Sequence, residues 1–137
     1  MTMTTKTTLP EGIRARLTFF KVIVEDLGVA QDFYNGAFGL IPVQTIESDD
    51  MEEVVMGRGE GGRETSLILY RHKDGRTLNS GNLHGPMGFQ VSDVDAVYAH
   101  AIAQGAVPVR PPFTFGNSRV AFVADPDGHE IELLRYI

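Results

Sequence analysis

The sequence predicts an α+β fold made of two βαβββ modules, because short segments at the helix boundaries of its first half recur in its second half. The segment VEDL at residues 24–27 matches VSDV at residues 91–94, 67 positions later. The segment GLIPV at residues 39–43 matches GAVPV at residues 105–109, 66 positions later. Two matched points with a one-residue shift between them indicate an internal duplication, and a single copy could not cover its own sheet.

The first module begins with LTFFKVIV, a run rich in β-branched and aromatic residues that is typical of a strand. Asp26 can cap the following helix, which carries apolar residues at helical spacing and is expected to end at Gly39, shortly before Pro42. Three more strands are expected at residues 43–47, 53–56 and 65–70. The glycine-rich turn at 57–64 lacks the spacing and the helix of a phosphate-binding loop.

The second module repeats this order. A strand is expected at residues 87–91, and Asp93 or Asp95 can cap a helix, DAVYAHAIAQ, that Gly105 ends. The predicted organisation is a loose tail followed by one domain that contains both modules and a linker. Their bounds are 1–16 for the tail, 17–137 for the domain, about 17–75 and 87–137 for the modules, and 76–86 for the linker.

The composition narrows the class of protein. A chain of 137 residues is most simply one domain, and the absence of cysteine rules out disulfides and thiolate metal sites. The net charge of −6 argues against nucleic acid or an anionic membrane as a partner. No apolar run approaches the roughly 20 residues of a membrane span, and the first residues lack the apolar centre of a secretory signal. We therefore expect a soluble, cytoplasmic protein.

Alternation along the strands predicts a hollow on the sheet face away from each helix. Phe20, Val22 and Val24 suit the helix-covered face, as do Leu67 and Leu69, and Ile131 and Leu133. The side chains of opposite parity are expected to face the hollow: Leu17, Phe19, Lys21, Ile23, Ser66, Ile68, Tyr70, Glu130, Glu132, Leu134 and Tyr136.

The duplicated strand–helix–Gly–Pro pattern, DFYNGAFGLIPV and the terminal VAFVADPDGHEIEL together resemble the vicinal oxygen chelate superfamily. This family includes glyoxalase I, bleomycin-resistance proteins and extradiol dioxygenases, and the resemblance covers about residues 17–137. It implies paired βαβββ modules that form a cupped sheet, and it implies a homodimer.

The resemblance also implies a metal position that this sequence has largely lost. Metal enzymes of the family take one ligand from each of four strands, typically two histidines and two glutamates. The corresponding positions hold Phe19, Ile68 and about Pro86, and only Glu132 in EIEL keeps a ligand. One carboxylate cannot hold a divalent ion tightly, so we expect no metal cofactor.

Several roles stay open for Glu132. It could join His72 and His84 in a rearranged metal site, since both histidines share the parity of inward positions. In an apolar hollow its pKa would rise, which suits a general base or a partner for a ligand. It could also form an ion pair with Lys21 or an arginine.

The sequence of PPFTFG predicts an extended segment that places Phe113 and Phe115 on one side, where they could form an aromatic lid over the hollow. Arg119 could meet a ligand carboxylate or lie on the surface. His100 is expected on the solvated face of the second helix, and His129 is explained by the DPDGH turn alone.

The function expected from these features is binding of a small apolar or aromatic compound. The compound would bind in a pocket with aromatic walls, without the family metal. The expected ligand-binding residues are Phe19, Lys21, Ile68, Tyr70, Phe113, Phe115 and Tyr136. The alternative is a glyoxalase-like lyase or isomerase with Glu132 as general base or as part of a rearranged metal site.

Overall fold

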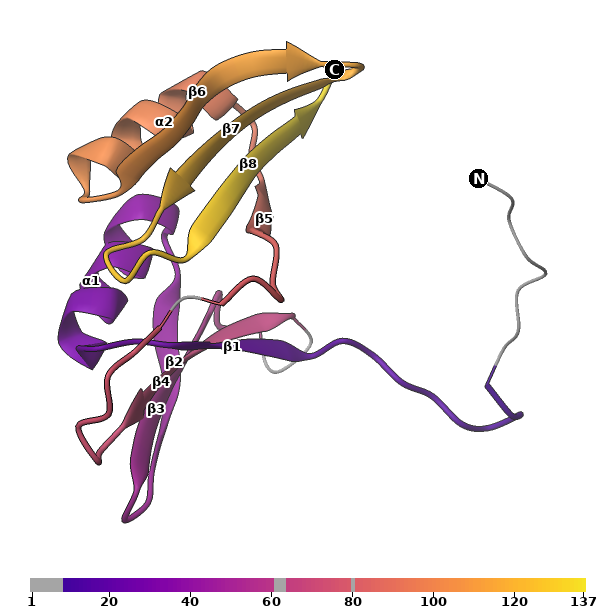
Figure 1. Cartoon of the computed structure of the whole chain (residues 1–137). Coiled ribbons are helices and arrows are strands. Elements are labelled where there is room, and N and C mark those ends of the chain that lie inside the picture. Colours follow the sequence, from indigo (N-terminus) through magenta and orange to yellow (C-terminus); the bar gives the residue numbers. More distant parts are fainter. Residues whose placement is uncertain (1–8, 61–63, 80) are drawn as a thin grey trace.

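The computed structural model describes residues 9–60, 64–79 and 81–137. Figure 1 shows two sheets, with the two helices side by side along one side of them and residues 9–18 extending away from the first sheet. The predicted tail lies partly outside the described residues, and residues 9–18 form no helix or strand. No helix in the described ranges is long and apolar enough to cross a membrane.

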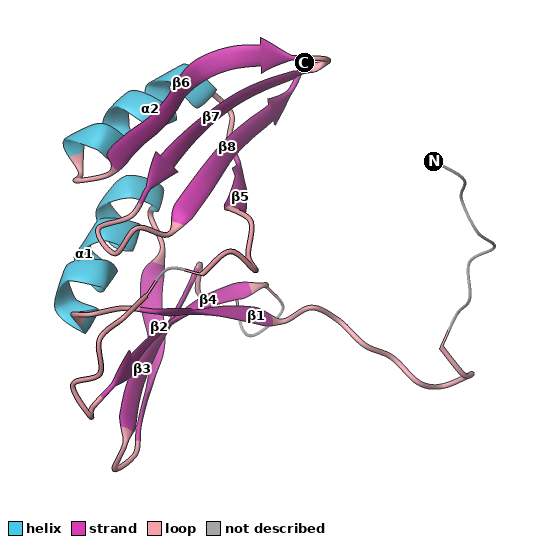
Figure 2. Cartoon of the chain, viewed as in Figure 1, coloured by secondary structure: helices cyan, strands magenta, loops and turns pink. Residues whose placement is uncertain are grey.

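Each half of the chain contains a strand, a helix and three further strands, which confirms the predicted α+β class (Figure 2). The first half holds β1 (Phe19–Ile23), α1 (Leu27–Phe38), β2 (Ile41–Glu47), β3 (Met51–Gly57) and β4 (Ser66–His72). The second half holds β5 (Met87–Gln90), α2 (Val94–Ala103), β6 (Val107–Phe115), β7 (Ser118–Ala124) and β8 (Glu130–Tyr136).

The two sheets share one topology, β1-β4-β3-β2 and β5-β8-β7-β6. The pairs β1–β4 and β5–β8 are parallel, and the other pairs are antiparallel. The register shifts at Pro42 in β2 and at Pro108 in β6, two equivalent points of the repeat. Proline donates no N–H to a ladder and is therefore tolerated on such edge strands. The shared irregularity supports the duplication inferred from the sequence.

The helix termini follow the predicted capping chemistry. Asp26 accepts a hydrogen bond from the N–H of Val29 at 3.0 Å, and Gly39 ends α1 with a φ of 72°, a conformation that glycine adopts without strain. In the second module Asp93 caps α2 by accepting from Ala96. Asp95 is therefore not the cap, because its side chain pairs with Arg119 instead.

One apolar core joins the two modules. The side chains predicted to lie under the helices are buried there: Val22, Val24, Leu67, Leu69, Ile131 and Leu133. Across the modules, Phe38 of α1 stacks on Phe89 of β5 with ring centroids 4.2 Å apart. His100 of α2 was expected only to face solvent, but its Nε2 lies 2.6 Å from the carbonyl oxygen of Gly36 in α1.

One local prediction was wrong. Phe20 was expected under a helix but is 44% exposed, because the linker rather than α1 lies against it and places His84 beside its ring. The PPFTFG segment is extended as predicted, but it belongs to strand β6, which runs through Phe115 and pairs with β7.

Candidate ligand-binding site

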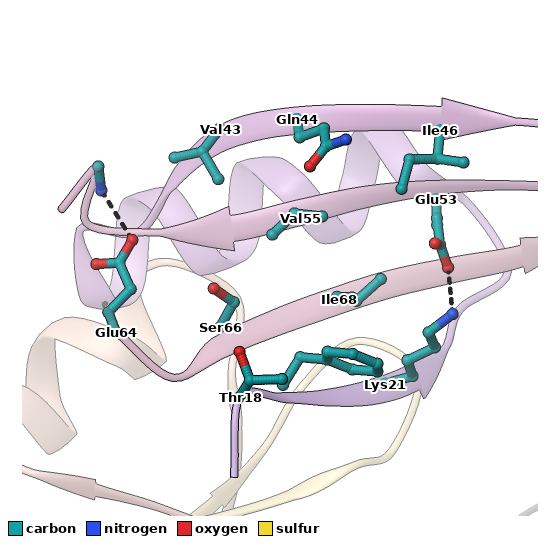
Figure 3. Close-up of a pocket in the computed structure, with 12 residues that line it drawn as sticks. Thr18, Lys21, Val43, Gln44, Ile46, Glu53, Val55, Glu64, Ser66 and Ile68 are labelled. Atoms are coloured by element: carbon teal, nitrogen blue, oxygen red, sulfur yellow. Dashed lines mark hydrogen bonds and ion pairs between the residues drawn. The ribbon is translucent and has the colours of Figure 1, made fainter. Parts of the chain in front are cut away.

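A cavity of about 610 Å³ opens on the first sheet, on the face away from α1 (Figure 3). All four strands of that sheet contribute to its wall, together with both ends of the glycine-rich turn. The lining residues are Thr18, Phe19, Lys21, Val43, Gln44, Ile46, Glu53, Val55, Gly59, Glu64, Ser66 and Ile68. No residue of the second sheet belongs to this lining.

The middle of the cavity is apolar and its ends are polar. Phe19, Val55 and Ile68 supply apolar surface from three neighbouring strands, and β2 adds Val43 and Ile46. Figure 3 shows the Lys21–Glu53 pair at one end and Glu64 at the other. A concave, mainly apolar wall with a few polar groups is the usual form of a small-molecule site.

Lys21 and Glu53 form an ion pair in the cavity wall. Lys21 Nζ lies 2.9 Å from Glu53 Oε2; the residue Glu53 is 4% exposed, whereas the side chain of Lys21 is 38% exposed. The ammonium also lies 5.6 Å from the ring centroid of Phe19 and 5.4 Å from that of Tyr70, within cation–π range. A carboxylate this deeply buried requires such a partner.

The ion pair with Lys21, one of the roles open for Glu132, does not form. Lys21 and Glu53 lie on the same sheet, where β4 separates their strands, while Glu132 lies on the other sheet. Among the residues that the structure describes, Glu132 has neither a hydrogen bond nor an ion pair through its side chain, and it is half-buried. Its neighbours across the ladders are Gly88 and Phe122.

Glu64 organises the turn that borders the other end of the cavity. One of its carboxylate oxygens accepts the N–H of Arg58 at 3.0 Å. The other oxygen accepts those of Gly59 at 3.2 Å and Glu60 at 3.3 Å. Three backbone donors on one carboxylate fix this side of the turn, so Glu64 has a structural explanation besides its place in the wall.

The structure brings together only part of the predicted ligand-binding set. Phe19, Lys21 and Ile68 line the cavity, and Tyr70 contacts the Lys21 ammonium. The remaining predicted ligand-binding residues, Phe113, Phe115 and Tyr136, belong to the second sheet and do not line it, and neither does the candidate general base Glu132.

The predicted aromatic lid does not form over this cavity. Phe113 stacks on Phe122 within the second sheet, with centroids 6.4 Å apart, and lies under the guanidinium of Arg110. Phe115 is 71% exposed and Tyr136 is 62% exposed. Both modules were expected to contribute to one hollow, but each sheet has its own open face.

The rearranged metal site is not assembled within the chain. His72 lies beside Tyr70 at the end of β4, His84 meets Phe20 in the linker, and Glu132 is in β8. Across the described ranges, no group of three or more His, Cys, Asp or Glu side chains is placed to hold a metal ion. At the positions implied by the family resemblance, the phenyl ring of Phe19 and the aliphatic side chain of Ile68 provide no ligand atom.

Sequence reasoning missed Glu53, the most buried charged residue of the cavity wall. The signal was present in MEEVVM, where Val54 and Met56 are buried under α1 and their alternate neighbours Glu53 and Val55 face the cavity.

Known proteins share both the sequence pattern and the fold. The family model described as Glyoxalase/Bleomycin resistance protein/Dioxygenase superfamily matches residues 16–133. Lactoylglutathione lyase of Neisseria meningitidis serogroup A is 28% identical over 127 residues, which cover 88% of this chain and 90% of that protein. A probable lactoylglutathione lyase of Vibrio cholerae is 27% identical over 116 residues, covering 82% and 84%.

Solved glyoxalase structures have the same architecture. Glyoxalase I of Leishmania major has a TM-score of 0.78 at 24% identity, with 89% of this chain and 87% of that chain covered. Glyoxalase I of Zea mays has a TM-score of 0.80 at 21% identity, with 89% of this chain and 45% of that chain covered. At these identities the likeness shows the fold alone. The family model spans nearly the whole chain, and on that match the chain belongs to the Glyoxalase/Bleomycin resistance protein/Dioxygenase superfamily.

Proposed function

We propose that the protein binds a small, largely apolar or aromatic organic compound in the cavity of the first sheet, without the metal usual in the family. The observation that carries this proposal is the pair of apolar side chains, Phe19 and Ile68, in the cavity wall. The family resemblance implies a histidine and a glutamate at these two positions. Their replacement removes metal ligands and adds apolar contact surface for a ligand.

The residues present do not fit the family's metal. Phe19, Ile68 and the region of Pro86 provide no side-chain donor, and Glu132 is a single ligand. Divalent ions need several ligands in a defined geometry.

Ligand binding before and after metal removal tests this proposal. Native mass spectrometry and elemental analysis of the purified protein would identify a co-purified compound and any bound metal. For that compound, affinity should be the same before and after treatment with EDTA. An affinity that disappears with EDTA and returns with a divalent ion would contradict the proposal.

A glyoxalase-like lyase or isomerase is the second candidate, and the names of the relatives favour it. The relatives from Neisseria meningitidis and Vibrio cholerae are called lactoylglutathione lyase and probable lactoylglutathione lyase. In this chain Glu132 would act as general base, and its carboxylate makes no described hydrogen bond that would occupy it. Glu132→Gln should then abolish turnover, whereas a protein that only binds in the first cavity should keep its affinity.

We further propose that the protein is a homodimer, as the family resemblance implies. Exposed apolar side chains on both edge strands support an association surface: Ile41 and Val43 on β2, and Val107 and Val109 on β6. Sedimentation at micromolar concentration should give a species of twice the 15.0 kDa chain mass. A single species at the mass of one chain would contradict the dimer.

A further inference from the structure

The charged end of the cavity contains hydrogen-bonding capacity that the protein itself does not use. Glu53 accepts from Lys21 through Oε2 alone, and Oε1 has no hydrogen-bond donor among the described residues. Lys21 carries three N–H donors, and one of them is directed to Glu53. Both residues line the cavity.

The surroundings hold these two groups in place. Glu53 and Lys21 reach toward each other across β4, whose Ile68 is the register partner of Lys21 (Figure 3). The rings of Phe19 and Tyr70 flank the ammonium. The Glu53 side chain is only 5% exposed, so the carboxylate lies within the wall, whereas the Lys21 side chain is 38% exposed and its ammonium can be reached from the cavity.

The pair is electrically neutral as a whole, which restricts the ligand that it favours. A ligand carboxylate would gain from Lys21 but would be repelled by Glu53, and a ligand ammonium would meet the reverse. A neutral group that offers an acceptor to Lys21 and a donor to Glu53 satisfies both, and desolvated polar groups are costly when they are left unmatched.

We propose that the Lys21–Glu53 pair selects neutral ligands in which a carbonyl oxygen lies beside an N–H or O–H donor, attached to an aromatic or apolar body. Primary amides and α-hydroxy ketones have this arrangement. The apolar body occupies the surface of Phe19, Val55 and Ile68. This inference rests on the proposed function, because it names the ligand class of the same cavity.

Four related probes test the inference: benzamide, N,N-dimethylbenzamide, benzoate and benzylamine. They share the ring but present, in that order, a donor with an acceptor, an acceptor alone, an anion and a cation. Affinities come from titrations that follow the amide NMR signals of the residues lining the cavity. Benzamide should bind at least about tenfold more tightly than each of the others. This is the difference in affinity expected from one additional hydrogen bond to a charged group.

Variants of the pair should change this preference. Glu53→Gln leaves Lys21 as an unpaired cation and should shift the preference to benzoate. The double variant Lys21→Met/Glu53→Met removes both charges at similar volume, a type of change that folded proteins often tolerate. It should bind benzamide and N,N-dimethylbenzamide equally. As a matched control, Arg71→Met/Glu52→Met removes a pair between β4 and β3 of the same sheet that does not line the cavity, and should keep the wild-type preference.

The outcomes separate this inference from the proposed function. Binding of the probes in the cavity without preference for benzamide, or with preference for benzoate or benzylamine, would overturn the inference and leave the binding function intact. If no probe shifts the signals of the cavity residues, the proposed function fails, and the inference fails with it. A benzamide preference that survives in Lys21→Met/Glu53→Met would also overturn the inference.

Discussion

The phenol of Tyr34 donates a hydrogen bond of 2.7 Å to Oδ2 of Asp125, and both side chains are buried. Tyr34 belongs to α1, whereas Asp125 follows β7, so this bond joins the two modules inside their shared core. A buried carboxylate without such donors would destabilise the fold by several kcal/mol, on the order of the cost of an unpaired buried charge.

The rest of the DPDGH turn completes this connection. The other oxygen of Asp125 accepts the N–H groups of Asp127 and His129, each at 2.9 Å. Asp127 accepts from the N–H of Glu25 at 3.0 Å, and His129 Nε2 lies 2.8 Å from the carbonyl oxygen of Ile23. The turn therefore fastens the second module to the β1–α1 junction of the first.

Tyr34→Phe should destabilise the protein by about 1–3 kcal/mol, because it leaves one oxygen of Asp125 buried without its hydroxyl donor. Urea unfolding followed by circular dichroism would measure this loss. Tyr98→Phe is the control, since the Tyr98 hydroxyl makes no hydrogen bond to the described residues and the side chain is half-buried. Equal effects of the two substitutions would contradict the role given to the Tyr34–Asp125 bond.

Stability should fall at alkaline pH partly through Tyr34. Burial, followed by the charge and hydrogen bond of Asp125, raises the pKa of Tyr34 above its ordinary value. In the unfolded chain the phenol ionises at about pH 10, while in the folded chain it keeps its proton. The unfolded state then binds fewer protons, so the free energy of unfolding falls as pH rises above about 10, by up to about 1.4 kcal/mol per pH unit.

The comparison of wild type with Tyr34→Phe isolates this contribution. Unfolding free energies measured between about pH 9 and pH 12 should decrease less steeply in the variant. Parallel curves would show that ionisation of Tyr34 does not contribute to the alkaline loss.

The sequence predicted the fold well because its signals are local and occur twice. Asp26 and Gly39 mark the ends of α1 by capping and left-handed geometry, which depend on a few neighbouring residues. Alternation placed Val22, Leu69 and Ile131 under the helices. The choice between Asp93 and Asp95 was not local, because it depends on Arg119, which is 24 positions away from Asp95.

For the site, the sequence predicted only which side chains of a strand face the cavity side of the sheet. Phe19, Lys21 and Ile68 follow from alternation, but the partner of Lys21 depends on strand order, which brings β3 near β1 through β4. The expectation that Phe113 and Glu132 join them required both sheets to face one cavity within the chain. The angle between two modules is set by core contacts such as Phe38 with Phe89, which no local pattern specifies.

Arg119→Gln should change ligand affinity less than about twofold, an effect too small for the loss of a direct charged contact. Both Nε and Nη2 of Arg119 bind the carboxylate of Asp95, at 2.9 and 2.8 Å, and these bonds lower the pKa of Asp95. The guanidinium is thus engaged at the start of α2 and is not part of the cavity lining. A large loss of affinity in a direct titration would contradict this prediction and indicate that Arg119 contacts the ligand.

Glu64→Ala should loosen the turn that borders the cavity, because the N–H groups of Arg58, Gly59 and Glu60 lose their common acceptor. Their hydrogen exchange should become faster by about tenfold or more, as expected for the loss of a hydrogen bond to a charged acceptor. Glu60→Ala is the control: among the described residues its carboxylate pairs only with the exposed Arg58 side chain, and its removal should leave the three amides unchanged. Because Glu64 also lines the cavity, ligand affinity should fall in Glu64→Ala and not in Glu60→Ala. Unchanged exchange in Glu64→Ala would mean that the carboxylate does not hold the turn in solution.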